Sequence, residues 1–261
     1  MKLTAIVAQF PVSLSIQKNL TSIDSVLEKA NPSDLVIFPE GSVSGYSSDI
    51  TFLNQINLDE LEAGLEHIKK ESQRRKINIW VGTCVKVKGE WFNTAQGFSP
   101  NGDVQIYHKI NLAHHERGVI SAGNTLPIFE LNTSEGTVKI GVQICRELRY
   151  PEQWRWLAQH GAQIILHLNN AVDDDTYQSV WKSHLISRAA ENQRFILSSN
   201  NAAQKQLSPT IAIAPDGKAI DEMVSAELGI FRVELELSKV SNWYLDQRRS
   251  DVLEIQAGVL Q

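Results

Sequence analysis

The chain contains only two cysteines, Cys84 and Cys145, among its 261 residues. Two cysteines do not make a disulfide framework, so the fold must depend on a hydrophobic core. An excess of positive charge is also lacking, because the net charge is −5 and the lysines and arginines are scattered, with no run longer than pairs and short clusters. This charge balance argues against nucleic acid or an anionic membrane as a partner.

Long hydrophobic runs are missing as well. The apolar segment 1–11 is too short to span a bilayer, and no other run approaches membrane length. This segment has a weak similarity to a signal peptide, but it has no clear small-residue cleavage site and an amphipathic helix pattern follows it. We therefore predict a first strand here, and a cytoplasmic protein whose thiols stay free.

The sequence does contain an alternation of strand-like and helix-like segments. Hydrophobic residues make up 42% of the chain, which is enough for a large core, and no Pro/Gly/Ser-rich linker divides it. We predict one domain over 1–261, of layered α/β class with buried mixed sheets. A turn at 99–102 predicts a hairpin, which argues against a purely parallel sheet. Strands are expected near 3–10, 35–38, 77–87, 91–98, 103–108, 137–145, 162–168, 194–200, 210–215 and 228–235, and helices near 15–30, 59–75, 151–160 and 175–193.

Cys145 ends the apolar segment Val138–Ile144, and charged residues follow at once. This pattern is typical of a buried strand that ends at a strand-to-helix corner, where the thiol turns towards a cleft. Amides at the end of the next helix would favour the thiolate. An isolated cysteine in such a place is more commonly structural, and Cys84, inside an apolar strand, has only that interpretation.

Two further apolar strands end in charged side chains that complement a thiol, Glu40 and Lys109. Strand ends line the clefts of α/β folds, so these groups are able to converge with Cys145. Glu40, desolvated by its apolar flank, would take the proton of the thiol. Lys109 and the backbone N–H of Arg146 would stabilise the negative charge that forms when sulfur attacks a carbonyl or nitrile carbon.

At these positions the sequence resembles the nitrilase superfamily of carbon–nitrogen hydrolases, and the resemblance covers nearly the whole chain. Each matching motif is weak alone, but all of them occur in order and at ordinary spacing. The motifs are Phe38-Pro39-Glu40 with Gly45-Tyr46, Lys109 with Leu112, the segment Cys145 to Glu152, Arg188 to Gln193, Ser208 to Gly217, and Arg248-Arg249-Ser250-Asp251.

The resemblance implies a four-layer α-β-β-α sandwich with two mixed sheets, which usually dimerises. It implies a catalytic triad of Glu40, Lys109 and Cys145. Glu116 matches the family's second glutamate, which helps to position the substrate or the lysine. The alternative for Glu116 is a solvated loop carboxylate.

The sequence departs from the family at three positions beside the triad. Asn111 stands where histidine is common, Arg146 where an aromatic residue is common, and Glu147 where aspartate is common. Arg146 could pair with a substrate carboxylate, which suits a guanidinium, or form a structural ion pair. Asn169 follows another apolar strand and could line the cleft, although a plain turn is equally consistent.

We predict no metal and no cofactor. His108, His114 and His115 lie in one stretch, but neighbouring residues on a strand or loop diverge. The sequence contains no His-Glu-x-x-His motif, no Cys-x-x-Cys pair and no glycine-rich phosphate loop.

These observations predict a cysteine hydrolase that cleaves a non-peptide carbon–nitrogen bond of a small carboxamide. A thioester would form, and ammonia and a carboxylic acid would be released. The family likeness and Arg146 favour an ω-amidase-like substrate that carries a carboxylate. Nitrile and N-carbamoyl substrates remain open on the same triad. The alternative from a different class is a catalytically silent family member that acts as a binding or interaction module.

Overall fold

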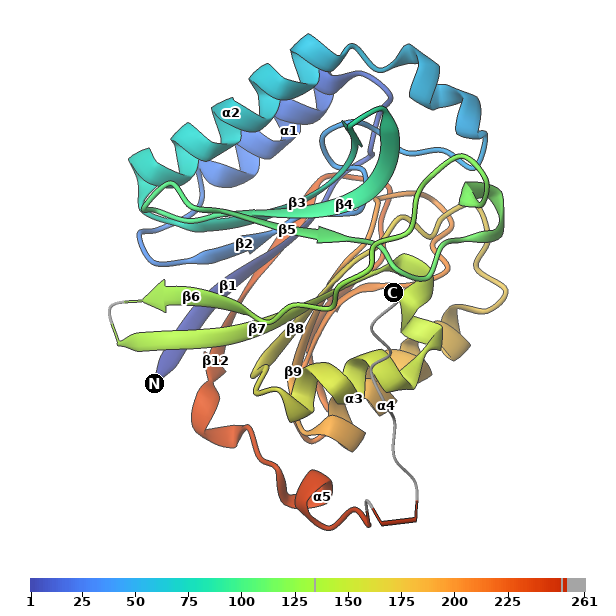
Figure 1. Cartoon of the computed structure of the whole chain (residues 1–261). Helices are drawn as coiled ribbons and strands as arrows, with labels where there is room; N and C mark the ends of the chain where they lie inside the picture. The colour runs from blue at the N-terminus through green and yellow to red at the C-terminus, as the bar shows by residue number, and fades with distance from the viewer. Residues whose placement is uncertain (134, 250, 253–261) are drawn as a thin grey trace.

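The computed structural model describes residues 1–133, 135–249, 251 and 252, so Ser250 of the C-terminal motif lies outside the described residues. Two six-stranded sheets pack face to face, and helices cover the outer face of each (Figure 1). The strand order is β12-β1-β2-β3-β4-β5 in the first sheet and β11-β10-β9-β8-β7-β6 in the second. Both sheets contain parallel and antiparallel pairs, so the predicted α-β-β-α sandwich with two mixed sheets is confirmed.

The first sheet and its helices follow the predicted pattern. Ile16, Leu20, Ile23 and Leu27 have helical spacing in the sequence, and all four are buried between their helix and this sheet. Ser15 caps the same helix with a side-chain hydrogen bond. The elements are β1 (Lys2–Gln9), α1 (Ile16–Leu27), β2 (Leu35–Ile37), α2 (Leu58–Arg75), β3 (Asn78–Val87), β4 (Glu90–Phe98), β5 (Val104–His108) and β12 (Gly229–Glu236).

The second sheet contains two strands that the sequence pattern did not predict. They are its two edge strands, β6 (Phe129–Thr133), which pairs with β7, and β11 (Ala219–Met223), which pairs with β10. β11 is largely exposed, so it lacks the apolar alternation that marks a half-buried strand. The other elements are β7 (Gly136–Ile144), α3 (Pro151–Gln159), β8 (Ile164–Leu168), α4 (Gln178–Asn192), β9 (Phe195–Ser199), β10 (Thr210–Ile213) and the short α5 (Trp243–Asp246).

The parallel strands β7, β8 and β9 end side by side. Ile144 is paired with Leu168, and Leu168 is paired with Ser199, so the residues after these three strands meet at one edge of the sheet. The residues after β2 reach the same place, because the Glu40 N–H donates to the Asn169 carbonyl at 3.2 Å. Strand ends from both sheets therefore meet at one end of the sandwich.

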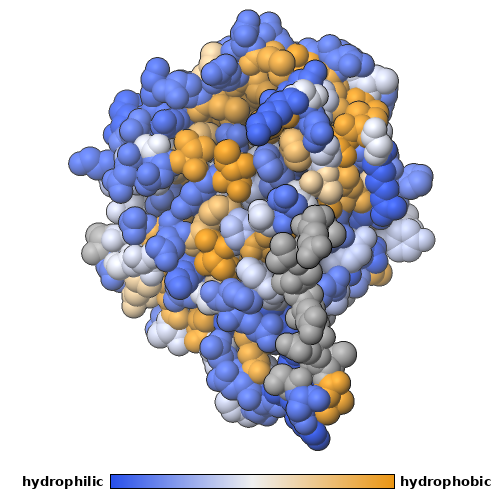
Figure 2. Space-filling model, in the orientation of Figure 1, coloured by the Kyte–Doolittle hydropathy of each residue, from blue (hydrophilic) through white to orange (hydrophobic). Residues whose placement is uncertain are grey.

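No helix of the described part of the chain is long and apolar enough to cross a membrane. On the face shown in Figure 2, hydrophobic residues form separate groups among hydrophilic ones. Val104 and Ile106, on the edge strand β5, are among the exposed hydrophobic residues. The dimer and the cytoplasmic location remain predictions.

Candidate active site

Lys109 follows β5 directly, and its ammonium lies between two carboxylates. Its Nζ is 3.0 Å from Glu40 Oε1 and 3.1 Å from Glu116 Oε1, and all three side chains are fully buried. Burial alone would lower the pKa of Lys109. Its acidic neighbours, with Glu40 the strongest, raise that pKa above its ordinary value instead, so the lysine stays charged.

Glu116 is held by several donors besides Lys109. Asn93 of β4 donates from Nδ2 to Oε1 of both Glu40 and Glu116, at 2.7 Å each, and the Tyr46 hydroxyl donates to Glu116 Oε1 at 2.7 Å. Burial raises the pKa of Glu116, but the Lys109 charge and these donors lower it further, so the net pKa is below its ordinary value. Because Glu116 is buried and ionised, the alternative of a solvated loop carboxylate is wrong.

Glu40 is held through its backbone and keeps one free oxygen. Its N–H donates to the Asn169 carbonyl, and its own carbonyl accepts from Asn170 Nδ2 at 3.2 Å. Its Oε2 atom is buried and has no hydrogen-bond partner among the described residues. A buried carboxylate oxygen without a donor is able to accept a proton from a neighbouring acid.

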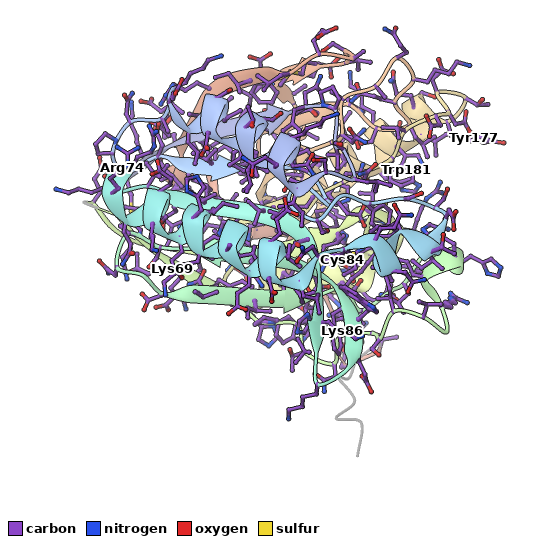
Figure 3. The ribbon with its side chains drawn as sticks, turned by 90° about the horizontal axis from the view of Figure 1, so that it is seen from above. Lys69, Arg74, Cys84, Lys86, Tyr177 and Trp181 are labelled. Atoms are coloured by element: carbon purple, nitrogen blue, oxygen red, sulfur yellow. The ribbon has the colours of Figure 1, made fainter. Side chains whose placement is uncertain are left out.

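Cys145 begins a short 3-10 turn, Cys145–Arg149, which we call the cysteine turn, and its φ is +49°. This left-handed conformation costs a residue with a side chain about 1–3 kcal/mol, and such strain clusters at active sites. The residue Cys145 is partly exposed, whereas Cys84 is fully buried. Cys84 lies near the middle of the view in Figure 3, well inside the outline of the molecule.

The thiol of Cys145 is neutral at rest. Burial and then the Glu40 charge raise its pKa above that of a free thiol, and Lys109 and the Asn170 N–H, which bonds to the sulfur, offset this only in part. A thiolate here would add negative charge beside two carboxylates and a single ammonium. The predicted stabilisation of the thiolate by helix-end amides is therefore outweighed, and Cys145 needs a base.

Glu147 joins the cysteine turn to the segment after β5, residues 109–112, which we call the lysine loop. Its Oε1 accepts from the N–H groups of Ile110 at 2.9 Å and Asn111 at 3.1 Å. Its Oε2 accepts from the Ile144 N–H at 2.8 Å, and the Tyr107 hydroxyl donates to both oxygens. A single buried carboxylate thus fixes the spacing between the lysine and the cysteine.

Arg146 and Asn169 differ in their exposure to solvent. Arg146 is exposed, and no ion pair links it to an acid in the described part of the chain, so the structural ion pair is not observed. Asn169 is fully buried, and its side-chain amide has no hydrogen-bond partner among the described residues. Asn169 contributes its carbonyl to the Glu40 backbone, so its role in substrate positioning remains a prediction.

The three histidines near the lysine loop diverge. His108 Nδ1 lies 2.8 Å from Thr94 Oγ1, His115 Nε2 lies 2.9 Å from the Tyr46 hydroxyl, and His114 is exposed. Among residues 1–133, 135–249, 251 and 252, no group of three or more His, Cys, Asp or Glu side chains is placed to hold a metal ion.

The sequence reasoning assigned no role to Tyr46, Asn93 or Asn170. Tyr46 was part of a matching motif, and Asn170 directly follows Asn169. Asn93 lies within strand β4 and is buried. A buried amide requires hydrogen-bond partners, so a polar residue in a buried strand was the available signal. The identity of those partners is not visible in the sequence, because they follow other strands.

The model of the carbon–nitrogen hydrolase family matches residues 3–244 of the chain. The chain belongs to the carbon–nitrogen hydrolase family. This confirms the predicted family and makes the chain an enzyme of carbon–nitrogen bond hydrolysis.

Two similar proteins match nearly the whole of this carbon–nitrogen hydrolase. A hydrolase in the agr operon of Staphylococcus aureus is 28% identical over 246 residues, which cover 90% of this chain and 89% of that protein. The 2-oxoglutaramate amidase of Bacillus subtilis is 27% identical over 252 residues, which cover 92% of this chain and 93% of that protein.

Solved structures show the same fold. A mutant of the amidase from Nesterenkonia sp. AN1 in complex with butyramide has a TM-score of 0.80 and 22% sequence identity, over 96% of this chain and 95% of that chain. Another mutant of that amidase, at 21% identity, shows covalent addition of the acetamide moiety of fluoroacetamide at the active site cysteine.

Proposed function

We propose that the chain acts, as one domain over 1–261, as an amidase that hydrolyses a small carboxamide through a thioester on Cys145. The observation that carries this proposal is the buried cluster of Glu40, Lys109 and Glu116 beside Cys145, a partly exposed residue whose thiol has a raised pKa. The cluster supplies a base with a free oxygen, a fixed cation and a nucleophile that needs activation. The fluoroacetamide adduct of the Nesterenkonia amidase supports a cysteine in this role.

Acylation begins when Glu40 Oε2 accepts the thiol proton and the Cys145 sulfur attacks the amide carbon. The carbonyl oxygen gains negative charge, which Lys109 and the backbone N–H of Arg146 stabilise. Glu40 then delivers its proton to the amide nitrogen, and the carbon–nitrogen bond breaks. The products are ammonia and a thioester on Cys145.

Deacylation uses the same groups in the second half of the cycle. Glu40 takes a proton from a water molecule, whose oxygen attacks the thioester carbon. Lys109 and the Arg146 N–H stabilise the tetrahedral oxyanion as before, the carbon–sulfur bond breaks, and Glu40 gives its proton to the sulfur. Glu116 and Asn93 keep Lys109 and Glu40 at their separation throughout both steps.

Arg146 favours a substrate that carries a carboxylate. Its guanidinium is exposed beside Cys145 and forms no ion pair with a described residue, so it is available to a ligand. A planar guanidinium binds a carboxylate through two parallel hydrogen bonds. The similarity to the 2-oxoglutaramate amidase of B. subtilis supports such a substrate. Nitriles and N-carbamoyl compounds are the alternatives on the same triad.

The test is ammonia release from matched amides with and without a carboxylate, such as succinamate and butyramide. We expect Cys145→Ala to abolish hydrolysis. Arg146→Gln should lower kcat/KM for succinamate by about 10- to 100-fold, the value of a hydrogen-bonded charge, and leave butyramide nearly unchanged. Arg149→Gln, which removes the same charge from the same turn, is the control.

The outcomes separate the alternatives. Carbon dioxide formed together with ammonia from an N-carbamoyl substrate would indicate the carbamoyl branch, and turnover of nitriles alone would indicate a nitrilase. If wild type and Cys145→Ala are equally silent across the panel, the binding or interaction module is supported and the amidase is rejected. An equal effect of Arg146→Gln on both amides would remove the carboxylate from the proposal.

A further inference from the structure

His167 is a buried polar residue directly behind the cysteine turn, and the mechanism above does not use it. It lies on β8, where it is paired with Ser198 of β9 in register, and its side chain is fully buried. Its Nε2 is 2.9 Å from the Cys145 carbonyl oxygen, and its Nδ1 is 2.8 Å from Ser198 Oγ. The Trp154 ring of α3 packs against the imidazole, with 5.7 Å between ring centroids.

These contacts determine the protonation of the ring. A carbonyl oxygen only accepts hydrogen bonds, so Nε2 of His167 must carry the hydrogen. Burial lowers the pKa of His167 to about 4, so the imidazole is neutral at neutral pH and its Nδ1 is an acceptor. The Ser198 hydroxyl donates to that nitrogen. The Cys145 carbonyl therefore selects this tautomer, and the Ser198 hydroxyl, which is able to donate or accept, supports it by donating.

The hydrogen bond from His167 to the Cys145 carbonyl also sets the direction of the Arg146 N–H. The described residues contain no cis peptide bond, so the carbonyl of Cys145 and the N–H of Arg146 point to opposite sides of one planar peptide unit. A hydrogen bond that holds the carbonyl towards β8 therefore holds the N–H away from β8. This N–H is one of the two donors to the tetrahedral oxyanion in the proposed mechanism.

Hydrogen bonds that do not involve His167 hold the rest of the cysteine turn. Trp154 Nε1 donates to the Glu147 carbonyl at 3.0 Å, and the Glu147 carboxylate accepts from the Ile144 N–H. These bonds fix the residues on either side of the Cys145–Arg146 peptide. The strained φ of Cys145 makes the orientation of this peptide dependent on contacts such as the one from His167.

We propose that His167 is a positioning residue of the oxyanion hole, which holds the Cys145 carbonyl so that the Arg146 N–H of the same peptide faces the developing oxyanion. The proposal rests on the amidase function proposed above. His167 contacts neither the sulfur nor the substrate in this account. It acts only in reactions that form an oxyanion.

The role of His167 can be tested with two reactions of the Cys145 sulfur, of which only one forms an oxyanion. Amide hydrolysis passes through a tetrahedral oxyanion. Alkylation by iodoacetamide forms a carbon–sulfur bond at a saturated carbon while iodide leaves and the thiol proton passes to a base, so no oxyanion forms. A positioning role in the oxyanion hole should therefore affect hydrolysis and spare alkylation.

The experiment compares His167→Leu, which fills the site without a donor, with His167→Gln, which restores an amide donor. We expect His167→Leu to lower kcat about 10- to 100-fold, somewhat less than removal of an oxyanion donor, with KM changed less than about threefold. The rate of Cys145 alkylation should stay within about twofold, and His167→Gln should recover most of kcat. Ser198→Ala should cause a smaller loss in the same direction, and His160→Leu, at an exposed histidine, should change nothing.

Parallel loss of kcat and alkylation in His167→Leu would overturn the proposal, because His167 would then support the thiol or the fold in general. Unchanged kcat would overturn it as well. If the wild type hydrolyses no amide, the proposed function fails, but the role of His167 can still be tested. The measurement is then the formation of a thiohemiacetal between Cys145 and ¹³C-labelled acetaldehyde, monitored by NMR. Equal adduct formation in wild type and His167→Leu would then refute the role of His167.

Discussion

At the scale of single residues, Glu40 affects Cys145 in two opposite ways. As a neighbouring negative charge it raises the pKa of the thiol, and as the proposed base it removes the thiol proton. Lys109 is shared between Glu40 and Glu116, so its charge is already neutralised and lowers the Cys145 pKa only in part. The site therefore holds the nucleophile protonated until the base accepts its proton.

Glu40→Gln should separate these two effects. We expect amide hydrolysis to fall about 100- to 10,000-fold, which is the contribution of proton transfer by a positioned group. Alkylation of Cys145 by iodoacetamide should persist, because loss of the Glu40 charge lowers the thiol pKa. Peptide mass spectrometry measures labelling of Cys145 against Cys84, which is fully buried and should react slowly. Faster labelling of Cys84, or loss of both activities in Glu40→Gln, would contradict this account of the site.

At the scale of elements, the site depends on two short connections, the lysine loop after β5 and the cysteine turn after β7. They belong to different sheets, and the Glu147 carboxylate bonds to backbone N–H groups of both. Burial raises the pKa of Glu147, although the Asn111 and Ile144 N–H groups and Tyr107 lower it in part. A carboxylate is retained at this position because it accepts from donors on two sides.

Glu147→Gln should therefore weaken both stability and activity. One oxygen becomes an amide group that cannot accept a hydrogen bond, so at least one backbone N–H loses its partner, at a cost of about 1–3 kcal/mol. The lysine loop and the cysteine turn would then separate, which lowers kcat more than it changes KM. Urea unfolding and steady-state kinetics measure the two effects, with Glu152→Gln, at an exposed glutamate of α3, as the control. A variant as stable and active as wild type would show that Glu147 does not join the two segments.

At the scale of the whole molecule, the sandwich buries groups that would titrate in the unfolded chain. His167 has an ordinary pKa of 6.5, which burial lowers to about 4 in the folded protein. Between these values the unfolded chain binds more protons than the folded protein, so the free energy of unfolding rises with pH. The contribution of His167 is complete above about pH 6.5 and is lost as the pH falls towards 4.

The corresponding prediction concerns acid stability. The shift of His167 from 6.5 to about 4 corresponds to up to about 3 kcal/mol of unfolding free energy lost on acidification. Urea unfolding of wild type and His167→Gln at several pH values from 7 to 4.5 measures the difference in their free energies of unfolding. The contributions of the other titrating groups largely cancel in this difference. The variant should lose less stability on acidification than wild type. Identical pH dependence of the two proteins would show that His167 is not buried as a neutral imidazole.

The sequence by itself determined the elements whose burial is regular. Helical spacing of apolar residues predicted α1 and α2, and apolar segments that end in charged or reactive side chains placed Glu40, Lys109 and Cys145 at strand ends. These features are local, because periodicity and strand ends are properties of neighbouring residues. The exposed edge strand β11 had no such pattern, and its pairing with β10 comes from the sheet itself.

The tertiary structure alone decided the protonation and orientation of the site. The Asn93 amide meets a carboxylate 53 residues away, and His167 meets the Cys145 carbonyl 22 residues away. The burial that keeps Cys145 protonated and Glu116 out of solvent arises only when the two sheets close over the strand ends. Dielectric surroundings and hydrogen-bond partners belong to the packed molecule, and a linear pattern of residue types does not contain them.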